Sequence, residues 1–122
     1  MIKHNNWFSI TDISDNIIIT FNSTTNNVEF EEYLNYYKKI YDSQKHIEVV
    51  FDCRNIIYIS IENICKKIVL MKTMQPTHKI YLDKFYIIVS SRYMQSVINF
   101  AFSVVKPVSE CEILDTLPSG FL

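Results

Sequence analysis

The residues best suited to chemistry or recognition follow two apolar runs, at points where a strand is expected to lead into a helix. They are Asp52, Arg54, Ser60, Glu62, Asn63, Ser91 and Arg92. The two carboxylates could serve as a general acid and base, which requires a pocket and perturbed pKa values. The set also holds both arginines of the chain, and a guanidinium is shaped for bidentate contact with a carboxylate or phosphate. We predict that these residues form a surface that binds a partner or ligand.

Each of these residues also has a structural explanation that needs no ligand. Ser60 and Ser91 are typical helix N-caps. Asp52 could pair with Arg54 or tie down its own turn, and Glu62 would complement the positive end of a helix dipole. For single residues the structural explanation is favoured, so a binding role depends on the loops forming one surface.

Motifs of the common enzyme classes are missing from the sequence. Phosphate-cradling loops need glycine where the backbone bends sharply or approaches the anion, and the only glycine is Gly120. The P-loop, the G-x-G-x-x-G fingerprint and the G-x-S-x-G nucleophile elbow are therefore absent. We predict a protein that is not an enzyme, with no catalytic residue and no cofactor.

The cysteines and histidines are spaced too widely to suggest a metal site. The cysteines are Cys53, Cys65 and Cys111, and the histidines are His4, His46 and His78. Neither set contains a C-x-x-C, H-x-x-x-H or H-E-x-x-H spacing. Three separate cysteines indicate reduced and mostly buried thiols. We expect no metal.

Length and charge narrow the class of protein further. A chain of 122 residues, 48% of them hydrophobic, is the size of one domain with one core. Its 12 basic and 13 acidic residues give a net charge of -1, which argues against nucleic acid or an anionic membrane as partner. The apolar runs fall far short of the ~20 residues that cross a bilayer, and residues 1–11 lack a signal-peptide layout. We expect a single cytoplasmic domain over residues 1–122, with residues 1–5 and 117–122 loose and no membrane span.

The first half of the chain predicts a hairpin, a helix and a strand. Residues 7–13 and 17–21 are rich in β-forming side chains and are separated by a short polar turn, which is typical of an antiparallel hairpin. In "NVEFEEYLNYYKKIY" the large apolar residues recur with helical spacing. The core face of this helix would hold Phe30, Tyr33, Leu34, Tyr37 and Tyr41. The strand "IEVVF" hardly alternates, which indicates cover on both of its faces.

The second half predicts two further helices and two strands. Ser60 is suited to cap a helix that ends by Pro76. Its core face would hold Ile61, Ile64, Cys65, Ile68 and Met71; a helix capped by Ser90 or Ser91 would bury Tyr93, Val97, Phe100, Ala101 and Val104. "FYIIVSS" and "CEIL" are the fourth and fifth strands. Residues 76–84 are expected to be an irregular connector, in which "HKIYL" could carry another turn of helix. The order β-β-α-β-α-β-α-β predicts an α/β fold with a mostly parallel five-stranded sheet and an antiparallel edge strand.

This order, with the pattern "VVFDCRNIIYIS", resembles the STAS domain, the anti-sigma-factor-antagonist-like (SpoIIAA-like) module, over residues 7–115. The pattern consists of an apolar strand, an Asp, a polar turn, apolar residues and a helix start. The resemblance implies a non-enzymatic regulatory or scaffold domain. It would bind a protein partner through the loop and helix near Ser60, and that partner could be a second copy of the chain.

The chain departs from the phosphorylated members of that family at the start of the second long helix. Those members carry Asp-Ser-Ser/Thr-Gly, whereas this chain reads Ser60-Ile61-Glu62-Asn63. The phosphorylatable hydroxyl and the glycine are both missing. If Glu62 takes the phosphoacceptor place, it supplies a permanent single negative charge where phosphate would add nearly two. A kinase-driven switch at this position is therefore in doubt.

A second resemblance covers the C-terminal half. "QPTHKIYLDKFYIIVSSRYMQSVINFAFSVVKP" is similar to part of the CRAL-TRIO lipid-binding domain, in which a Pro precedes a strand and a helix ends in Lys-Pro. This resemblance implies the alternative function of a small carrier of lipid or another apolar ligand. CRAL-TRIO domains are larger and have additional helices that gate a lipid cavity. A chain of this size is expected to fill its interior with its own side chains.

Overall fold

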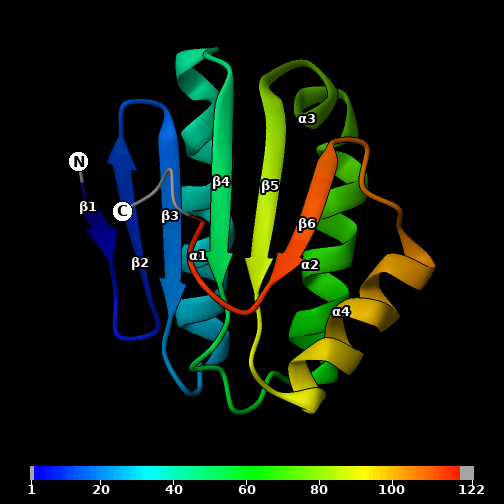
Figure 1. The fold of residues 1–122 in the computed structure, drawn as a ribbon. Coiled ribbons are helices and arrows are strands. Elements are labelled where there is room, and N and C mark those ends of the chain that lie inside the picture. Colours follow the sequence, from blue (N-terminus) through cyan, green and yellow to red (C-terminus); the bar gives the residue numbers. More distant parts are fainter. Residues whose placement is uncertain (1, 119–122) are drawn as a thin grey trace.

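A computed structural model of the chain describes residues 2–118 and shows a six-stranded sheet with helices packed on it (Figure 1). The strands are β1 (Ile2–His4), β2 (Phe8–Ile13), β3 (Asn16–Phe21), β4 (Ile47–Asp52), β5 (Leu82–Ile88) and β6 (Glu110–Leu114). The helices are α1 (Asn27–Lys39), α2 (Ile61–Thr73), α3 (Gln75–Tyr81) and α4 (Arg92–Val104), with a 3-10 turn, η1 (Ile40–Ser43), after α1. Strand order in the sheet follows the sequence from β1 to β6.

The predicted hairpin is formed by β2 and β3 and is closed by Ser14 and Asp15. Both turn residues have positive φ, 51° and 70°, as two-residue hairpin turns that match the twist of the strands require. Aspartate tolerates this conformation better than most residues because its short side chain can hydrogen-bond locally.

The sheet has one strand more than predicted, because β1 pairs antiparallel with the outer edge of β2. The expectation that residues 1–5 are loose is therefore wrong for residues 2–4. A hairpin edge presents unpaired backbone donors and acceptors, and a neighbouring extended segment can pair with them whatever its side chains. At the other end, residues 117–118 lie in no helix or strand, and residues 119–122 lie outside the described part of the chain.

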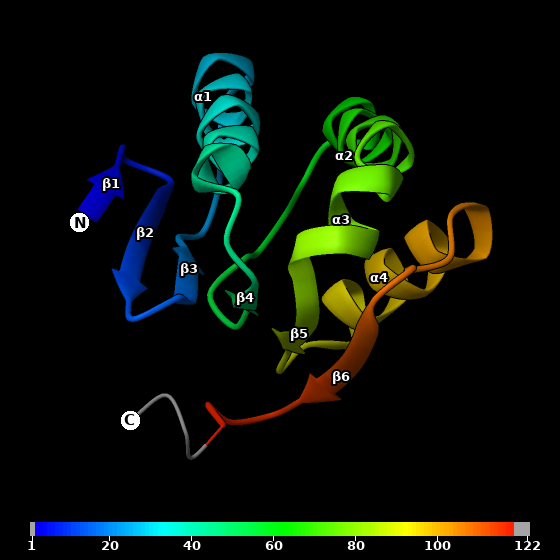
Figure 2. The same cartoon turned by 90° about the horizontal axis from the view of Figure 1, so that it is seen from above.

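The remaining strands confirm the predicted α/β fold class. β3, β4, β5 and β6 are parallel, and β2 runs antiparallel to β3. Seen from above, α1, α2, α3 and α4 all lie on the same side of this sheet (Figure 2). Right-handed crossovers between strands that are added in sequence order send every helix to the same face. Helices therefore cover only one face of β4, whereas its sequence predicted cover of both faces by helices or neighbouring strands.

The second face of the sheet carries polar pairs along with buried aliphatic residues. Lys84 Nζ lies 3.4 Å from Glu110 and 3.0 Å from Glu112, across neighbouring strands. Val50 and Ile88, whose strand positions place them on this face, are nevertheless fully buried. The segment that follows β6 runs back across the ends of β5 and β4 on this side (Figures 1 and 2). Because residues on this face are buried too, the sequences of β4 and β5 hardly alternate between apolar and polar residues, although helices cover only one face.

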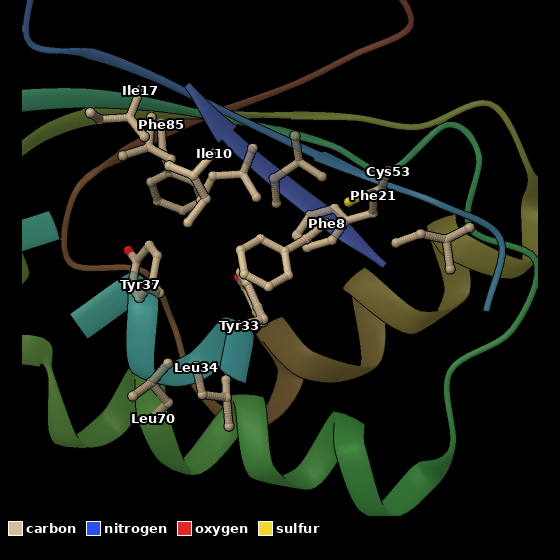
Figure 3. Packing of buried hydrophobic residues seen from close by; sticks show 14 of the residues in the cluster. Phe8, Ile10, Ile17, Phe21, Tyr33, Leu34, Tyr37, Cys53, Leu70 and Phe85 are labelled. Atoms are coloured by element: carbon tan, nitrogen blue, oxygen red, sulfur yellow. The ribbon is translucent and has the colours of Figure 1, made fainter. Parts of the chain in front are cut away.

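The main core lies between the sheet and the helices. Side chains of α1 point toward the strands, where Tyr33 meets Phe8 and Phe21, as Figure 3 shows, and the ring of Tyr37 meets that of Phe51. The predicted core face of α1 is confirmed, since Phe30, Tyr33, Leu34, Tyr37 and Tyr41 are all buried. Aromatic residues dominate this core because they bury the most apolar surface per residue.

The predicted inner faces of α2 and α4 are partly wrong. On α2, Ile61 and Cys65 are exposed while Asn63 and Leu70 are buried. On α4, the buried residues are Met94 and Ile98, whereas Tyr93, Phe100 and Val104 are exposed. Both helices have apolar side chains around most of their circumference, so periodicity alone could not identify the side that packs on the sheet.

The segment predicted to be an irregular connector is largely helical. Helix α2 ends at Thr73, and α3 begins at Gln75 with Pro76 in its first turn, where the missing proline N–H costs no helical hydrogen bond. None of the helices within residues 2–118 is long and apolar enough to cross a membrane.

Candidate functional site

The seven predicted site residues lie along the edge of the sheet where β4 and β5 end. The β4–α2 and β5–α4 connections meet at this edge, at the bottom of Figure 1. The Ser90 hydroxyl donates a hydrogen bond to the Arg54 carbonyl oxygen at 3.2 Å. The Tyr93 hydroxyl accepts from the Ile59 amide at 3.0 Å and donates to the Ile59 carbonyl at 2.9 Å. These bonds hold the two loops together as the sequence predicts, and the role of the surface in binding stays a prediction.

The side chains of Asp52 and Arg54 form a bidentate ion pair. The Arg54 guanidinium donates from Nε to Oδ1 at 2.9 Å and from Nη2 to Oδ2 at 2.7 Å, and the Arg54 amide also donates to Oδ1. Partial burial alone would raise the pKa of the Asp52 carboxyl, but the hydrogen bonds and charge of Arg54 outweigh it and hold the pKa below its ordinary value. This bidentate pair stiffens the turn after β4. The structural explanation of Asp52 is thus confirmed.

The serines at this edge act as helix caps. Ser60 Oγ accepts from the Asn63 amide at 3.2 Å, and Ser91 Oγ accepts from the Met94 amide at 3.1 Å. Ser90, the other candidate cap, instead bonds the neighbouring loop. The caps fix where α2 and α4 begin and hence where Arg92 projects.

Glu62 and Asn63, in the first turn of α2, were predicted to share one surface, but they differ in exposure. Glu62 is exposed, and Lys66 Nζ lies 3.6 Å from it and 2.9 Å from Glu31 of α1. Asn63 is buried, and its Oδ1 accepts no hydrogen bond among the described residues. Asn63 therefore lies off the surface, because it points toward the core side of α2.

A group of exposed apolar side chains at the same edge was not predicted from the sequence. We define the rim patch as Ile57, Tyr58, Ile61 and Tyr93, all of which are exposed. The rings of Tyr58 and Tyr93 stack at 6.3 Å with an interplanar angle of 19°. The Ile57 amide donates to the Ser23 carbonyl at 2.9 Å, which ties this loop to the β3–α1 connection as well. The only signal in the sequence was the apolar run "IIYI" in a segment between a strand and a helix.

Lys67, a half-buried residue that points from α2 toward the aromatic core, was likewise not predicted from the sequence. Its Nζ donates to the Tyr33 hydroxyl at 2.7 Å and lies 4.1 Å from the centroid of the Tyr37 ring and 5.0 Å from that of Phe51. Burial lowers the pKa of this amine to about 7, with a smaller opposing effect from Cys53. No carboxylate among the described residues forms an ion pair with it. Lysines are almost always exposed, so no sequence signal singled it out from Lys66.

Lys67 borders a cavity of about 150 Å³ between the sheet and the helices. The cavity is lined by side chains from β3, β4 and β5 and from all four helices, and its lining includes Trp7, Tyr33, Cys53 and His78. Burial raises the pKa of the Cys53 thiol to about 12, so this cysteine is protonated at neutral pH. The interior was expected to be filled by the chain's own side chains, and this cavity is an exception to that expectation.

A second polar group near the cavity consists of Tyr37, Tyr41 and His78, which are joined by hydrogen bonds through the Tyr37 hydroxyl. The Tyr37 hydroxyl lies 2.9 Å from His78 Nε2 and 2.7 Å from the Tyr41 hydroxyl. Burial, and then the positive charge of Lys67, lowers the pKa of His78 to about 4. His78 is therefore neutral at physiological pH and acts as a hydrogen-bond partner of Tyr37.

Neither region has the geometry of a familiar catalytic site. Asp52 is tied to Arg54 and Glu62 faces Lys66 on the helix surface, so the two carboxylates are not poised as an acid-base pair. Within residues 2–118, no three His, Cys, Asp or Glu side chains gather in a way that could hold a metal ion.

Comparisons with known proteins support the fold. No protein-family model matches the sequence, and no curated protein does so. A solved structure with a similar fold is that of an uncharacterised protein of the DUF3478 family from Shewanella loihica PV-4, described as SpoIIAA-like. The match has a TM-score of 0.61 and 11% sequence identity, and covers 93% of this chain and 91% of that chain. It does not bear out the CRAL-TRIO resemblance. The chain therefore has the predicted SpoIIAA-like, STAS-like α/β fold.

Proposed function

We propose that the protein is a non-enzymatic regulatory or scaffold domain that binds a protein partner through the rim patch. The observation that carries this proposal is the stacked Tyr58–Tyr93 pair, exposed beside Ile57 and Ile61. Exposed apolar side chains that lie together are typical of interaction sites, whereas scattered ones are not. Hydrogen bonds between the two loops hold the patch in place, which lowers the entropy lost on binding.

The polar residues around the patch favour a protein as the partner. Arg92 is exposed next to Tyr93, and no ion pair involves it among the described residues. Tyrosine and arginine are the residue types that most often dominate protein interfaces. A net charge of -1 over the chain gives no general attraction to nucleic acid. We expect a partner surface with an apolar centre and a carboxylate that reaches Arg92.

The alternative function, a lipid carrier, has weaker support. A cavity of about 150 Å³ is below the roughly 300–1,000 Å³ of pockets that hold drug-sized ligands. An acyl chain would require the core to open.

Ile61→Asp is expected to lower partner binding at least about tenfold, since a charge at the centre of an apolar interface is desolvated without a partner. Aspartate in the first turn of α2 suits the helix dipole, so the fold should be kept. The matched control is Val69→Asp on the same helix, because Val69 is 62% exposed and Ile61 is 63% exposed. Tagged variants expressed in the source cell would be compared by quantitative mass spectrometry of co-purified proteins.

Equal recovery of every co-purified protein by Ile61→Asp and Val69→Asp would contradict the proposal. If the partner is a second copy of the chain, sedimentation velocity should show a dimer for the wild type and Val69→Asp. Ile61→Asp should then be a monomer.

A further inference from the structure

The half-buried Lys67 directs its amine, and the buried Trp7 its indole N–H, into the region between the sheet and the helices, and neither group has an anionic partner among the described residues. The Lys67 side chain enters the core between α1, α2 and β4, and Nζ lies 4.9 Å from the centroid of the Tyr33 ring and 4.1 Å from that of Tyr37. Its one hydrogen bond to another side chain goes to the Tyr33 hydroxyl. Buried ammonium groups in proteins are normally paired with a carboxylate, because an unpaired charge in an apolar interior is costly.

Trp7 supplies the second unsatisfied group. The side chain is buried against Tyr33, with ring centroids 5.6 Å apart, and the Tyr33 hydroxyl also accepts the hydrogen bond from Lys67. The Trp7 indole N–H has no hydrogen-bond acceptor among the described residues. Buried polar atoms without a partner are rare in native proteins, and each one calls for an explanation such as a bound ligand.

Both residues line the same cavity. Its walls are otherwise mostly aliphatic and aromatic, and none of the described residues that line it is acidic. The volume of about 150 Å³ equals that of an engineered cavity in another protein that binds benzene, so it suits an apolar body of about six non-hydrogen atoms. The cavity thus offers two hydrogen-bond donors and an apolar space, without a negative charge to balance the amine.

We propose that this cavity binds a small monocarboxylate with an apolar body, whose carboxylate pairs with Lys67 and accepts from the Trp7 indole N–H. A carboxylate supplies the acceptors and the negative charge that the cavity lacks, while a neutral apolar molecule would leave both donors unsatisfied. Charge-assisted hydrogen bonds in a desolvated site are stronger than neutral ones. The proposal is independent of the rim patch, because neither residue belongs to it.

Benzoate is a suitable probe, and benzyl alcohol is a neutral probe with the same ring. Trp7 is the only tryptophan, so a single indole signal in a ¹H–¹⁵N NMR spectrum reports on the cavity. Benzoate is expected to shift this signal in the wild type with saturable, millimolar affinity. Lys67→Met should weaken benzoate binding at least about tenfold, since it removes a charge-assisted hydrogen bond to the carboxylate. Binding of benzyl alcohol should be unchanged or stronger.

The matched control is Lys66→Met, which makes the same substitution one residue earlier. Lys66 pairs with Glu31 and Glu62 outside the cavity, so benzoate should bind this variant as it binds the wild type. Equal benzoate affinity in Lys67→Met and the wild type would overturn the proposal. A wild-type indole signal that does not shift when benzoate is added up to its solubility limit would also overturn the proposal.

Discussion

Lys67→Met is expected to raise the free energy of unfolding at pH 6 by about 1–3 kcal/mol. A fall in the pKa of this amine from 10.5 to about 7 corresponds to roughly 5 kcal/mol of unfavourable free energy for the charged form. Attraction to the rings of Tyr33, Tyr37 and Phe51 offsets part of this cost, at about 0.5–2 kcal/mol for each ring. Methionine has a similar length and carries no charge, so it avoids the cost and keeps the core filled.

The gain should depend on pH in a definite direction. Below pH 7 the amine is protonated in both the folded and the unfolded chain, so the whole cost is present. Between about pH 7 and 10.5 the unfolded chain binds more protons than the folded one, and wild-type stability from this group therefore rises with pH. Urea unfolding at pH 6 and pH 9 should show that the advantage of Lys67→Met shrinks at the higher pH.

Lys66→Met is the control for this prediction too, because Lys66 forms only surface ion pairs. Its effect on the free energy of unfolding should be small, and nearly the same, at both pH values. A Lys67→Met variant that is less stable than the wild type at pH 6 would show that the amine stabilises the fold.

Trp7→Ala is expected to lower the free energy of unfolding by about 3–5 kcal/mol. The side chain is only 1% exposed, and its ring centroid lies 4.7 Å from that of Phe21 and 5.4 Å from that of Phe30. Truncation would leave a large void in the region where β2 and β3 pack on α1. A loss of this size is a large share of the 5–15 kcal/mol that is usual for a domain.

Urea unfolding followed by far-ultraviolet circular dichroism would measure this loss as a lower midpoint with an unchanged slope. Ile13→Ala is the control, because Ile13 lies at the end of β2 and is 55% exposed. Its effect should be below about 1 kcal/mol. Similar midpoints for Trp7→Ala and Ile13→Ala would contradict the description of the core.

The order of elements could be predicted from the sequence because strong patterns marked most of them. The stripe of large residues in α1 has a single apolar side, so its core face was identified correctly. The N-caps Ser60 and Ser91 marked the starts of α2 and α4. By contrast, β1 has only three residues, too few to show a strand pattern in the sequence, so its pairing with β2 was not predicted.

The candidate site was predictable only in part. Parallel strands that end at one edge bring Arg54, Ser60 and Arg92 together, and this follows from topology. The rotation of α2 about its axis does not follow from topology, and Asn63 and Lys67 lie on the core side of α2, where Ile61 and Cys65 were expected. Ile61 was therefore expected in the core, whereas it is an exposed member of the rim patch. Tertiary packing decided which of two apolar sides faced the sheet.

The rim patch and the cavity are both formed in part by helices α2 and α4. Helix α2 carries Ile61 of the rim patch near its start and Lys67 of the cavity about two turns later. Helix α4 supplies Tyr93 to the patch, while its buried residues Met94 and Ile98 line the cavity. Partner binding and occupancy of the cavity can nevertheless be tested separately, since Ile61→Asp and Lys67→Met alter different sides of α2.

Site-specific photo-crosslinking tests most directly whether the rim patch contacts a partner. A photoreactive phenylalanine analogue would replace Tyr58 in one variant and Ile80 of α3 in another, since both residues are 57% exposed. Irradiation in the source cell should yield an adduct of defined mass from position 58 and none from position 80. The same adducts from both positions, or an adduct from position 80 alone, would contradict the proposal that the rim patch binds the partner.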